Sequence, residues 1–320
     1  MSQTPPRARW IVAIPARNEA RRLPGALAAL DAAAARTGAE VRALVFANGC
    51  GDGTAEAARA VPLARVHLTV RVETLPPHLA HAGGARRAAV AAARAAFGAG
   101  PQDRLLTTDA DCRLAPDALA MADAAFAGGA DLVLAKIDCA PDPWSPADPA
   151  GVAWGTPGVL WRHKVRALTE ALRTGRAPSP LIHDDYGGAG IAVTPRAYDA
   201  LGGFAPVPSD EDRMLVAGAD RMGLMVHRWS GMAVTALTRS VGRASGGMAD
   251  AIERGARMAA AGRTPMVERS DLTLARLRAR PCHAHAFAAR VAAWEPAGDA
   301  IPALDAAMAE HLSGAMRWAS

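Results

Sequence analysis

The first 138 residues alternate short apolar runs with alanine-rich stretches of helical period, and this alternation limits the possible folds more than any other feature. Each apolar run is followed by a helical pattern, such as Leu23, Leu27 and Leu30 after the first run. Strands separated by helices pair in parallel, so the sequence predicts an α/β fold with a mainly parallel central sheet flanked by helices. The predicted strands are residues 10–14, 41–47, about 66–73, the run that begins at residue 105, and residues 131–138.

The size and charge of the chain narrow the classes of protein it can belong to. Its 320 residues fit one large domain, or one domain with an appendage. A net charge of +5 fits an anionic partner, although arginines on alanine-rich helices also serve solubility alone. No basic patch is interleaved with aromatic residues, so we expect no nucleic-acid partner.

The apolar runs are too short for membrane insertion. No stretch approaches 18 uninterrupted apolar residues, and Pro15, Arg17 and Glu19 interrupt the N-terminal run, which argues against a signal peptide. We therefore predict no transmembrane segment and a cytoplasmic location, with contact at a membrane surface left open. Cysteine spacing argues against a zinc site or a disulfide framework. The four cysteines are Cys50, Cys112, Cys139 and Cys282.

Two carboxylates end the fourth strand, in the stretch LLTTDADCRLAPDAL at residues 105–119. On an extended segment Asp109 and Asp111 point to the same side, so they converge if the strand continues that far. A convergent pair suits Mg²⁺ or Mn²⁺ at the carboxyl end of a strand. The alternative is a solvated turn in which an aspartate caps the next helix. Asn18 and Asp52 have a similar alternative, as caps of the helices that follow them.

The second half is less regular. Residues 139–150 are proline-rich and predict a long loop, and a helix is expected over about 151–173. A further helix carries Glu211 and Asp212 in its first turn, where acidic residues also stabilise the helix dipole. A strand-like run at 224–237 is followed by helical segments. We predict one domain over residues 8–240 and a helical C-terminal extension over 241–320.

Six blocks of the sequence, taken in order, resemble successive motifs of the family 2 glycosyltransferases, which have the GT-A fold. The resemblance covers roughly residues 10–228. The blocks are PARNEARRLPGAL, FANGCGDGTAEAA, GGARRAAVAAA, TTDADCRLAPDAL, GGAGIAVTPRAYDALGGF and SDEDRML.

The resemblance implies a binding site for a nucleotide-diphosphate sugar. The PARNE block would lie beside the base and ribose, and Asp52 and Arg86 match residues that often approach the nucleotide. Asn48 stands where the family usually has an acidic residue, and Arg87 where asparagine is frequent, so the base preference stays open. The residues implied at the nucleotide in these blocks are Pro15, Arg17, Asn18, Glu19, Asn48, Asp52, Arg86 and Asp109.

The resemblance also implies metal-dependent, inverting transfer to a hydroxyl acceptor. Asp111 would bind Mn²⁺ or Mg²⁺ directly, and Asp109 would contact the ribose or reach the metal through water. Asp212 matches the catalytic base, with Glu211 as the alternative. Arg239 and Arg243 match a basic loop over the diphosphate.

Other functions remain open. A sugar-1-phosphate nucleotidyltransferase would need a glycine-rich basic loop after the first strand, and an Asp-x-Asp phosphatase would need an aspartate where Ile14 and Pro15 stand. A catalytically silent nucleotide-sugar-binding protein of the same fold would fit Asn48 and Arg87. The acceptor could be a small molecule, a glycan or a lipid-linked molecule, and the C-terminal helices could form a homodimer or contact a membrane surface.

Overall fold

The structure is a computed structural model that describes residues 8–179, 181–185, 187–242, 246–279 and 294–312. The chain divides into two compact units. The first unit comprises residues up to Ala140 and Asp185–Leu237, and the second comprises Pro141–Asp184 and the residues from Thr238 onward. Each unit is therefore assembled from two separate segments of the chain. The prediction placed all of 8–240 in one domain, whereas 141–184 joins the C-terminal residues.

A seven-stranded sheet forms the centre of the first unit, in the order β3-β2-β1-β4-β8-β6-β9. The pairs among β1, β2, β3 and β4 are parallel, and β8 is antiparallel to both β4 and β6. The expected mainly parallel α/β sheet is confirmed, with β8 as an antiparallel insertion. The strands are β1 (Trp10–Ala16), β2 (Val41–Asn48), β3 (Val66–Glu73), β4 (Arg104–Thr107), β6 (Leu132–Leu134), β8 (Ile191–Val193) and β9 (Val226–His227).

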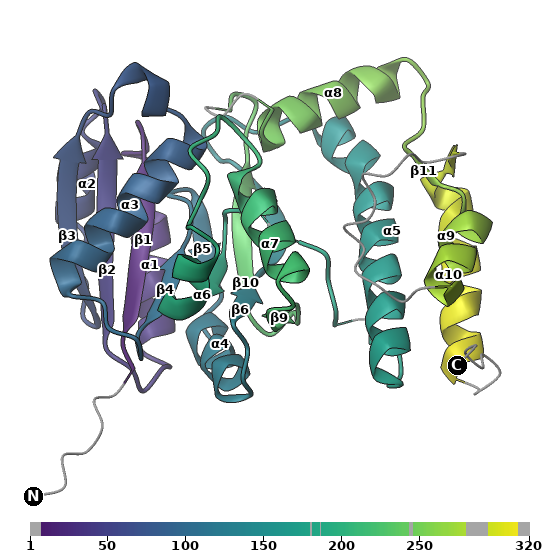
Figure 1. Cartoon of the computed structure of the whole chain (residues 1–320). Coiled ribbons are helices and arrows are strands. Elements are labelled where there is room, and N and C mark those ends of the chain that lie inside the picture. Colours follow the sequence, from purple (N-terminus) through teal and green to yellow (C-terminus); the bar gives the residue numbers. More distant parts are fainter. Residues whose placement is uncertain (1–7, 180, 186, 243–245, 280–293, 313–320) are drawn as a thin grey trace, which may run out of the picture. The chain divides into compact units, whose positions relative to one another are not determined.

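Helices cover both faces of this sheet because successive strand residues point to opposite faces. Trp10, Val12 and Ile14 join one buried cluster with α1 and α4, whereas Ile11 and Ala13 join another with α3 and α7. Figure 1 shows α3 crossing the sheet beside β1 and β2. The helices of this unit are α1 (Leu23–Ala34), α2 (Thr54–Arg59), the 3₁₀ helix η1 (Pro77–Leu79), α3 (Ala82–Phe97), α4 (Ala118–Ala127), α6 (Pro195–Ala200) and α7 (Glu211–Arg221).

A smaller sheet takes up parts of two predicted strands. The prediction of one strand over 131–138 is wrong: β6 ends at Leu134, and β7 (Lys136–Pro141) joins β10 (Ala233–Thr238) and β5 (Cys112–Leu114) in a three-stranded sheet. The change of sheet occurs at Ala135, whose N–H donates to the carbonyl of Gly190. The predicted strand over 224–237 divides in the same way, into β9 and β10.

The second unit has its own core. Trp161, Val165 and Leu168 of α5 pack with Leu277 and Leu304. Among the described residues, no helix combines the length and the apolar character that crossing a membrane requires. The elements of this unit are α5 (Pro149–Thr174), α8 (Met248–Ala260), β11 (Met266–Glu268), α9 (Ser270–Ala279), β12 (Trp294–Pro296) and α10 (Ala297–Leu312).

Candidate active site

The carboxyl ends of three neighbouring parallel strands, β1, β2 and β4, lie along one edge of the central sheet. Asn18 and Glu19 follow β1, Asn48 ends β2, and Asp109 and Asp111 follow β4. Open α/β sheets bind ligands at such an edge. The fold therefore gathers polar residues from three blocks that the sequence singled out.

Side chains join the loops after β1 and β2. The Asn18 side-chain oxygen accepts from the N–H of Gly51 at 2.9 Å, and Asp52 accepts from the N–H of Ala20 at 3.0 Å and of Thr54 at 3.1 Å. Burial alone would raise the pKa of Asp52, but the hydrogen bonds from Thr54 and Ala20 hold that pKa below its ordinary value. Asn18 and Asp52 thus shape the two loops.

The predicted cap at Asn18 is wrong. Helix α1 begins at Leu23, and its N-cap residue is Arg22, which makes no side-chain capping bond. Asn18 lies further upstream with a φ of 54°, in the left-handed region that asparagine tolerates better than most residues. Its side chain is directed to Gly51 instead of to the helix. Asp52 also precedes the N-cap of its helix, which is Gly53, although it does bond the N–H of Thr54.

The other residues of these two loops differ in exposure. Pro15 is half-buried opposite Phe46, and Arg17 is exposed. Glu19 is only 5% exposed, with its carboxylate 3.4 Å from the guanidinium of Arg22. Arg17 is therefore the predicted nucleotide contact of this loop that is most open to solvent.

Asn48 is buried at the end of β2. Its side-chain oxygen accepts from the N–H of Leu75 at 2.9 Å, which ties β2 to the segment after β3. A carboxylate could accept the same bond, so the exchange of acid for amide at this position keeps the local hydrogen bond and removes a negative charge.

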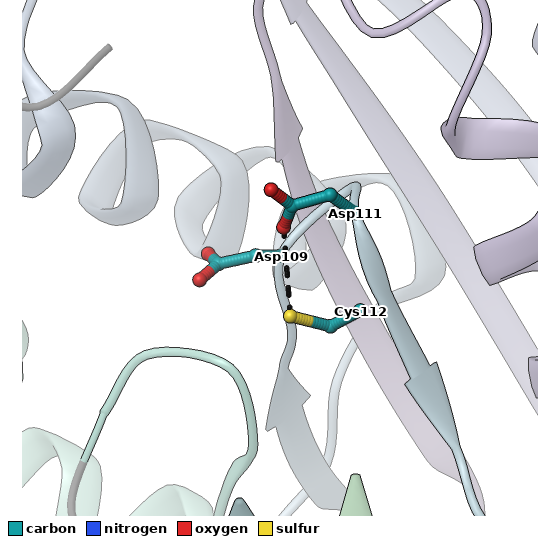
Figure 2. Close-up of side chains that lie close together, drawn as sticks. All are labelled: Asp109, Asp111 and Cys112. Atoms are coloured by element: carbon teal, nitrogen blue, oxygen red, sulfur yellow. Dashed lines mark hydrogen bonds between the residues drawn. The ribbon is translucent and has the colours of Figure 1, made fainter. Parts of the chain in front are cut away.

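Asp109, Asp111 and Cys112 form a compact cluster immediately after β4 (Figure 2). One possible ligand atom from each residue lies within 4.8 Å of the others. The expected convergence of the carboxylates is present, but its cause differs from the prediction. Strand β4 ends at Thr107, and a turn closed by a 3.1 Å hydrogen bond from the N–H of Cys112 to the carbonyl of Asp109 brings the side chains together.

The cluster fits a hard divalent cation. Such cations are held by one or two carboxylates together with substrate phosphates. The Cys112 thiol donates to Asp111 Oδ1 at 3.5 Å, and burial, followed by the charges of Asp111 and Asp109, raises the pKa of Cys112 well above its ordinary value. The thiol therefore stays protonated at neutral pH and acts as a donor, so the two carboxylates are the groups of this cluster that could hold a metal.

Arg86, on α3, connects this cluster to helix α7. Its Nε donates to Glu211 at 2.9 Å, and Nη2 donates to Asp109 at 2.9 Å. Nη1 donates to the hydroxyl of Thr107 at 3.1 Å and to the carbonyl of Gly188 at 2.9 Å. Burial alone would lower the pKa of Arg86, but the neighbouring carboxylates raise it above its ordinary value. Arg86 is thus a buried cation at the centre of an acidic site.

Asp212 lies beside this network, at the start of α7. Its two carboxylate oxygens accept from the N–H of Gly188 at 2.8 Å and from the N–H of Arg213 at 2.7 Å. Burial raises the pKa of Asp212, and the charge of Arg86 partly opposes that change. Because Gly188 bonds both Arg86 and Asp212, the carboxylate predicted as the base belongs to the same site as Asp109.

Arg239 and Arg243 are the two residues predicted in a basic loop. Arg239 belongs to the second unit, where it forms a β-bridge with Pro146 and lines a cavity of ≈ 370 Å³ with Asp148 and Arg257. Arg243 lies outside the described residues, as does Cys282.

Sequence reasoning missed the contributions of Thr107, Gly188 and Cys112 to the site. Each lies within or beside a block that had been singled out, so proximity in sequence was an available signal. Their roles depend on partners that local patterns do not reveal: Arg86 is 21 residues from Thr107 and 102 from Gly188. Arg87, which departs from the family pattern, donates to the carbonyls of Gly202 and Phe204 and so has a structural partner.

Comparison with solved structures identifies the fold. No protein-family model matches the chain, and no curated protein matches it. S. aureus TarS 1-349 in complex with UDP-GlcNAc aligns at TM-score 0.51 and 16% identity, over 75% of this chain and 61% of that chain. A Pyrobaculum calidifontis mannosyltransferase in complex with GDP-Man and Mn²⁺ aligns at TM-score 0.47 and 18% identity, over 98% of this chain and 89% of that chain. M. tuberculosis glucosyl-3-phosphoglycerate synthase aligns at TM-score 0.42 and 17% identity, over 81% and 82%.

The TarS alignment shows that the chain has the GT-A fold, as the sequence resemblance implied. The aligned part spans less than two thirds of the TarS chain, and the identities are low. The comparison therefore establishes the architecture, and the chemistry has to be argued from the site.

Proposed function

We propose that this protein is an inverting, metal-dependent glycosyltransferase that moves a sugar from a nucleotide-diphosphate donor to a hydroxyl acceptor. The observation that carries the proposal is the single guanidinium of Arg86 bonded to both Asp109 and Glu211. These carboxylates come from blocks about 100 residues apart. Asp109 lies two residues before Asp111, and Glu211 directly precedes Asp212. The solved TarS structure of the same fold holds UDP-GlcNAc, which supports a nucleotide sugar as the donor class.

Asp212 is the residue we assign as the general base. Both of its oxygens accept backbone N–H bonds, which hold the carboxylate in one orientation while leaving lone pairs for an acceptor hydroxyl. Glu211 is 3% exposed and is paired with Arg86, so we assign it a structural role in holding Arg86 and not the role of the base. One base that activates the acceptor opposite the leaving diphosphate produces inversion at the anomeric carbon.

Asp111 and Asp109 are the residues we assign to the metal. Mn²⁺ or Mg²⁺ held there would neutralise charge that develops on the leaving diphosphate. The Asp109 side chain is 36% exposed, so it is accessible to a ligand even though Oδ1 is held by Arg86. The loops built by Asn18, Asn48 and Asp52 would receive the nucleotide, with Arg17 as an exposed cation there.

The test is donor binding and cleavage with Mn²⁺, by calorimetric titration of UDP-, GDP- and dTDP-sugars followed by assay of the released nucleoside diphosphate. Asp111→Ala should lower cleavage at least about 100-fold, because the metal supplies several kcal/mol at the transition state. Asp117→Asn is the matched control, since its exposed carboxylate pairs only with Arg36 among the contacts described.

Three results would contradict this proposal. Donor binding without turnover by the wild type would indicate a silent binding protein. Consumption of a nucleoside triphosphate with a sugar phosphate would indicate a nucleotidyltransferase. Equal cleavage by Asp111→Ala and the wild type would remove Asp111 from the reaction.

A further inference from the structure

We propose that Arg86 is a positioning residue that holds the metal end and the base end of the site in register, and that the forked shape of its guanidinium, more than its charge, does this. The inference rests on the proposed function and adds a residue whose role the family resemblance assigned differently. It replaces the expected contact between Arg86 and the nucleotide with a role in building the site.

The hydrogen bonds of Arg86 leave little of it for a ligand. Four of its five N–H groups donate to partners within the first unit, at distances of 2.9 to 3.1 Å. Its side chain is 7% exposed and packs over the ring of Phe204, 5.7 Å from the ring centroid. A guanidinium so enclosed is part of the scaffold.

The partners of Arg86 come from three separate segments. Thr107 and Asp109 belong to the end of β4 and its turn, Glu211 begins α7, and Gly188 precedes β8. A planar fork can reach all of these acceptors at once, whereas a single ammonium on a flexible stem cannot. An ammonium group at this position would therefore neutralise the neighbouring carboxylates but would not hold the three segments in their present geometry.

Gly188 extends the effect of Arg86 to Asp212. Its carbonyl accepts from Arg86, and its N–H donates to Asp212 at 2.8 Å. A Cβ added to Gly188 would lie 2.0 Å from Arg86 Nη2, so the guanidinium occupies the space that any other residue would need. Arg86 and Gly188 thus determine each other's positions, and together they orient the carboxylate of Asp212.

The experiment separates geometry from charge with Arg86→Lys and Arg86→Gln. Mn²⁺ alone is the binding probe, followed by the electron paramagnetic resonance signal of the free ion, and kcat and KM are measured with the nucleotide sugar that the wild type cleaves fastest. Arg94→Gln is the matched control, because Arg94 lies on the same helix and pairs with Asp199 at the surface.

Arg86→Lys should bind Mn²⁺ within about threefold of the wild type but show kcat lowered about 100-fold, since a displacement of about 1 Å costs that much. Arg86→Gln should bind Mn²⁺ at least as tightly as the wild type, because a positive charge beside Asp109 is removed, and should lose kcat to a similar extent. If Arg86→Gln fails to fold, the lysine variant, which keeps the buried charge, carries the test.

Gly188→Ala gives a second, independent approach. It should lower kcat by a similar factor, and the double variant Arg86→Lys with Gly188→Ala should lose little more than either single variant, because both disturb one unit. A multiplicative loss in the double variant would overturn the coupling.

Two further results would overturn the inference. If Arg86→Lys keeps kcat within threefold of the wild-type value, the positive charge alone is sufficient to hold the site in its active geometry. If Mn²⁺ affinity and kcat fall together in Arg86→Lys, Arg86 has only a general structural role. Failure of the wild type itself to bind Mn²⁺ or to cleave a donor would instead refute the proposed function.

Discussion

Hydrogen bonds from backbone N–H groups fix the orientation of individual side chains in the site. Asp212 is held by the N–H groups of Gly188 and Arg213, Asn48 holds the N–H of Leu75, and Asp52 holds that of Ala20. Bonds of this kind fix the direction of a side chain without supplying a charged partner, so the carboxylate of Asp212 keeps its capacity to accept a proton.

The pH dependence of activity should report on Asp212. A base must be ionised, and burial raises the pKa of Asp212 above that of an exposed aspartate, about 4. The ionised fraction therefore rises with pH over a higher range than usual, and kcat/KM should fall as the pH is lowered through the raised pKa. Asp212→Asn should lower kcat by about 10² to 10⁴ and remove this acid limb of the profile.

Asp210→Asn is the control for that measurement. Asp210 is two residues away, is exposed, and has a φ of 66° that asparagine tolerates. It should keep the wild-type rate and the acid limb. An acid limb that persists unchanged in Asp212→Asn would assign the titration to another group.

Among the elements, the N-terminus of α3 sets the position of the segment that leads to α7. The N–H of Gly83 donates to the carbonyl of Val207, and a Cβ at Gly83 would lie 2.4 Å from the carbonyl oxygen of Ala205 and 2.5 Å from that of Val207. Gly83 and Gly84 both lie in the first turn of α3, where other backbone segments approach too closely for a side chain.

Gly83→Ala should therefore destabilise the first unit by about 1 to 3 kcal/mol, because the added methyl group overpacks the contact. The free energy of unfolding in urea measures this. Gly38→Ala is the matched control in the same unit: nothing lies within 4 Å of its added Cβ and its φ is not positive, so it should be neutral or slightly stabilising. Equal stability of the two variants would show that the 205–207 segment moves aside freely.

The whole molecule consists of two units with separate cores, and the chain passes between them three times. Residues 141–184 contribute α5, whose Trp161 and Leu168 pack with Leu277 and Leu304 of the same unit. The predicted domain of residues 8–240 therefore contains half of a core that the later helices complete. Dimer formation through the C-terminal helices and contact with a membrane surface stay predictions.

A truncated chain that ends at residue 240 should aggregate or elute as large species in size-exclusion chromatography, because the apolar side of α5 becomes exposed. A matched truncated chain in which a flexible glycine–serine linker also replaces residues 141–184 should remain monodisperse. If the first truncated chain behaves as well as the full chain, α5 does not need the C-terminal helices.

The sequence by itself determined the alternating elements, the edge at which the site forms and the carboxylates at that edge. Periodicity reports which side of each segment is buried, and that is a local property. The sequence also indicated Asp109, Asp111 and Asp212, through the resemblance of their blocks to motifs of one family. The GT-A fold implied by that resemblance is confirmed.

Only the tertiary structure decided which distant groups pair. The bond between Arg86 and Glu211 spans 125 residues, β8 enters the sheet antiparallel to β4 and β6, and 141–184 joins the C-terminal helices. Such pairings depend on the balance between the entropy of closing long loops and the packing that closure permits, and no local pattern records that balance. The turn after Thr107, where a strand was expected, leads into β5, whose partner in the smaller sheet is the distant strand β10.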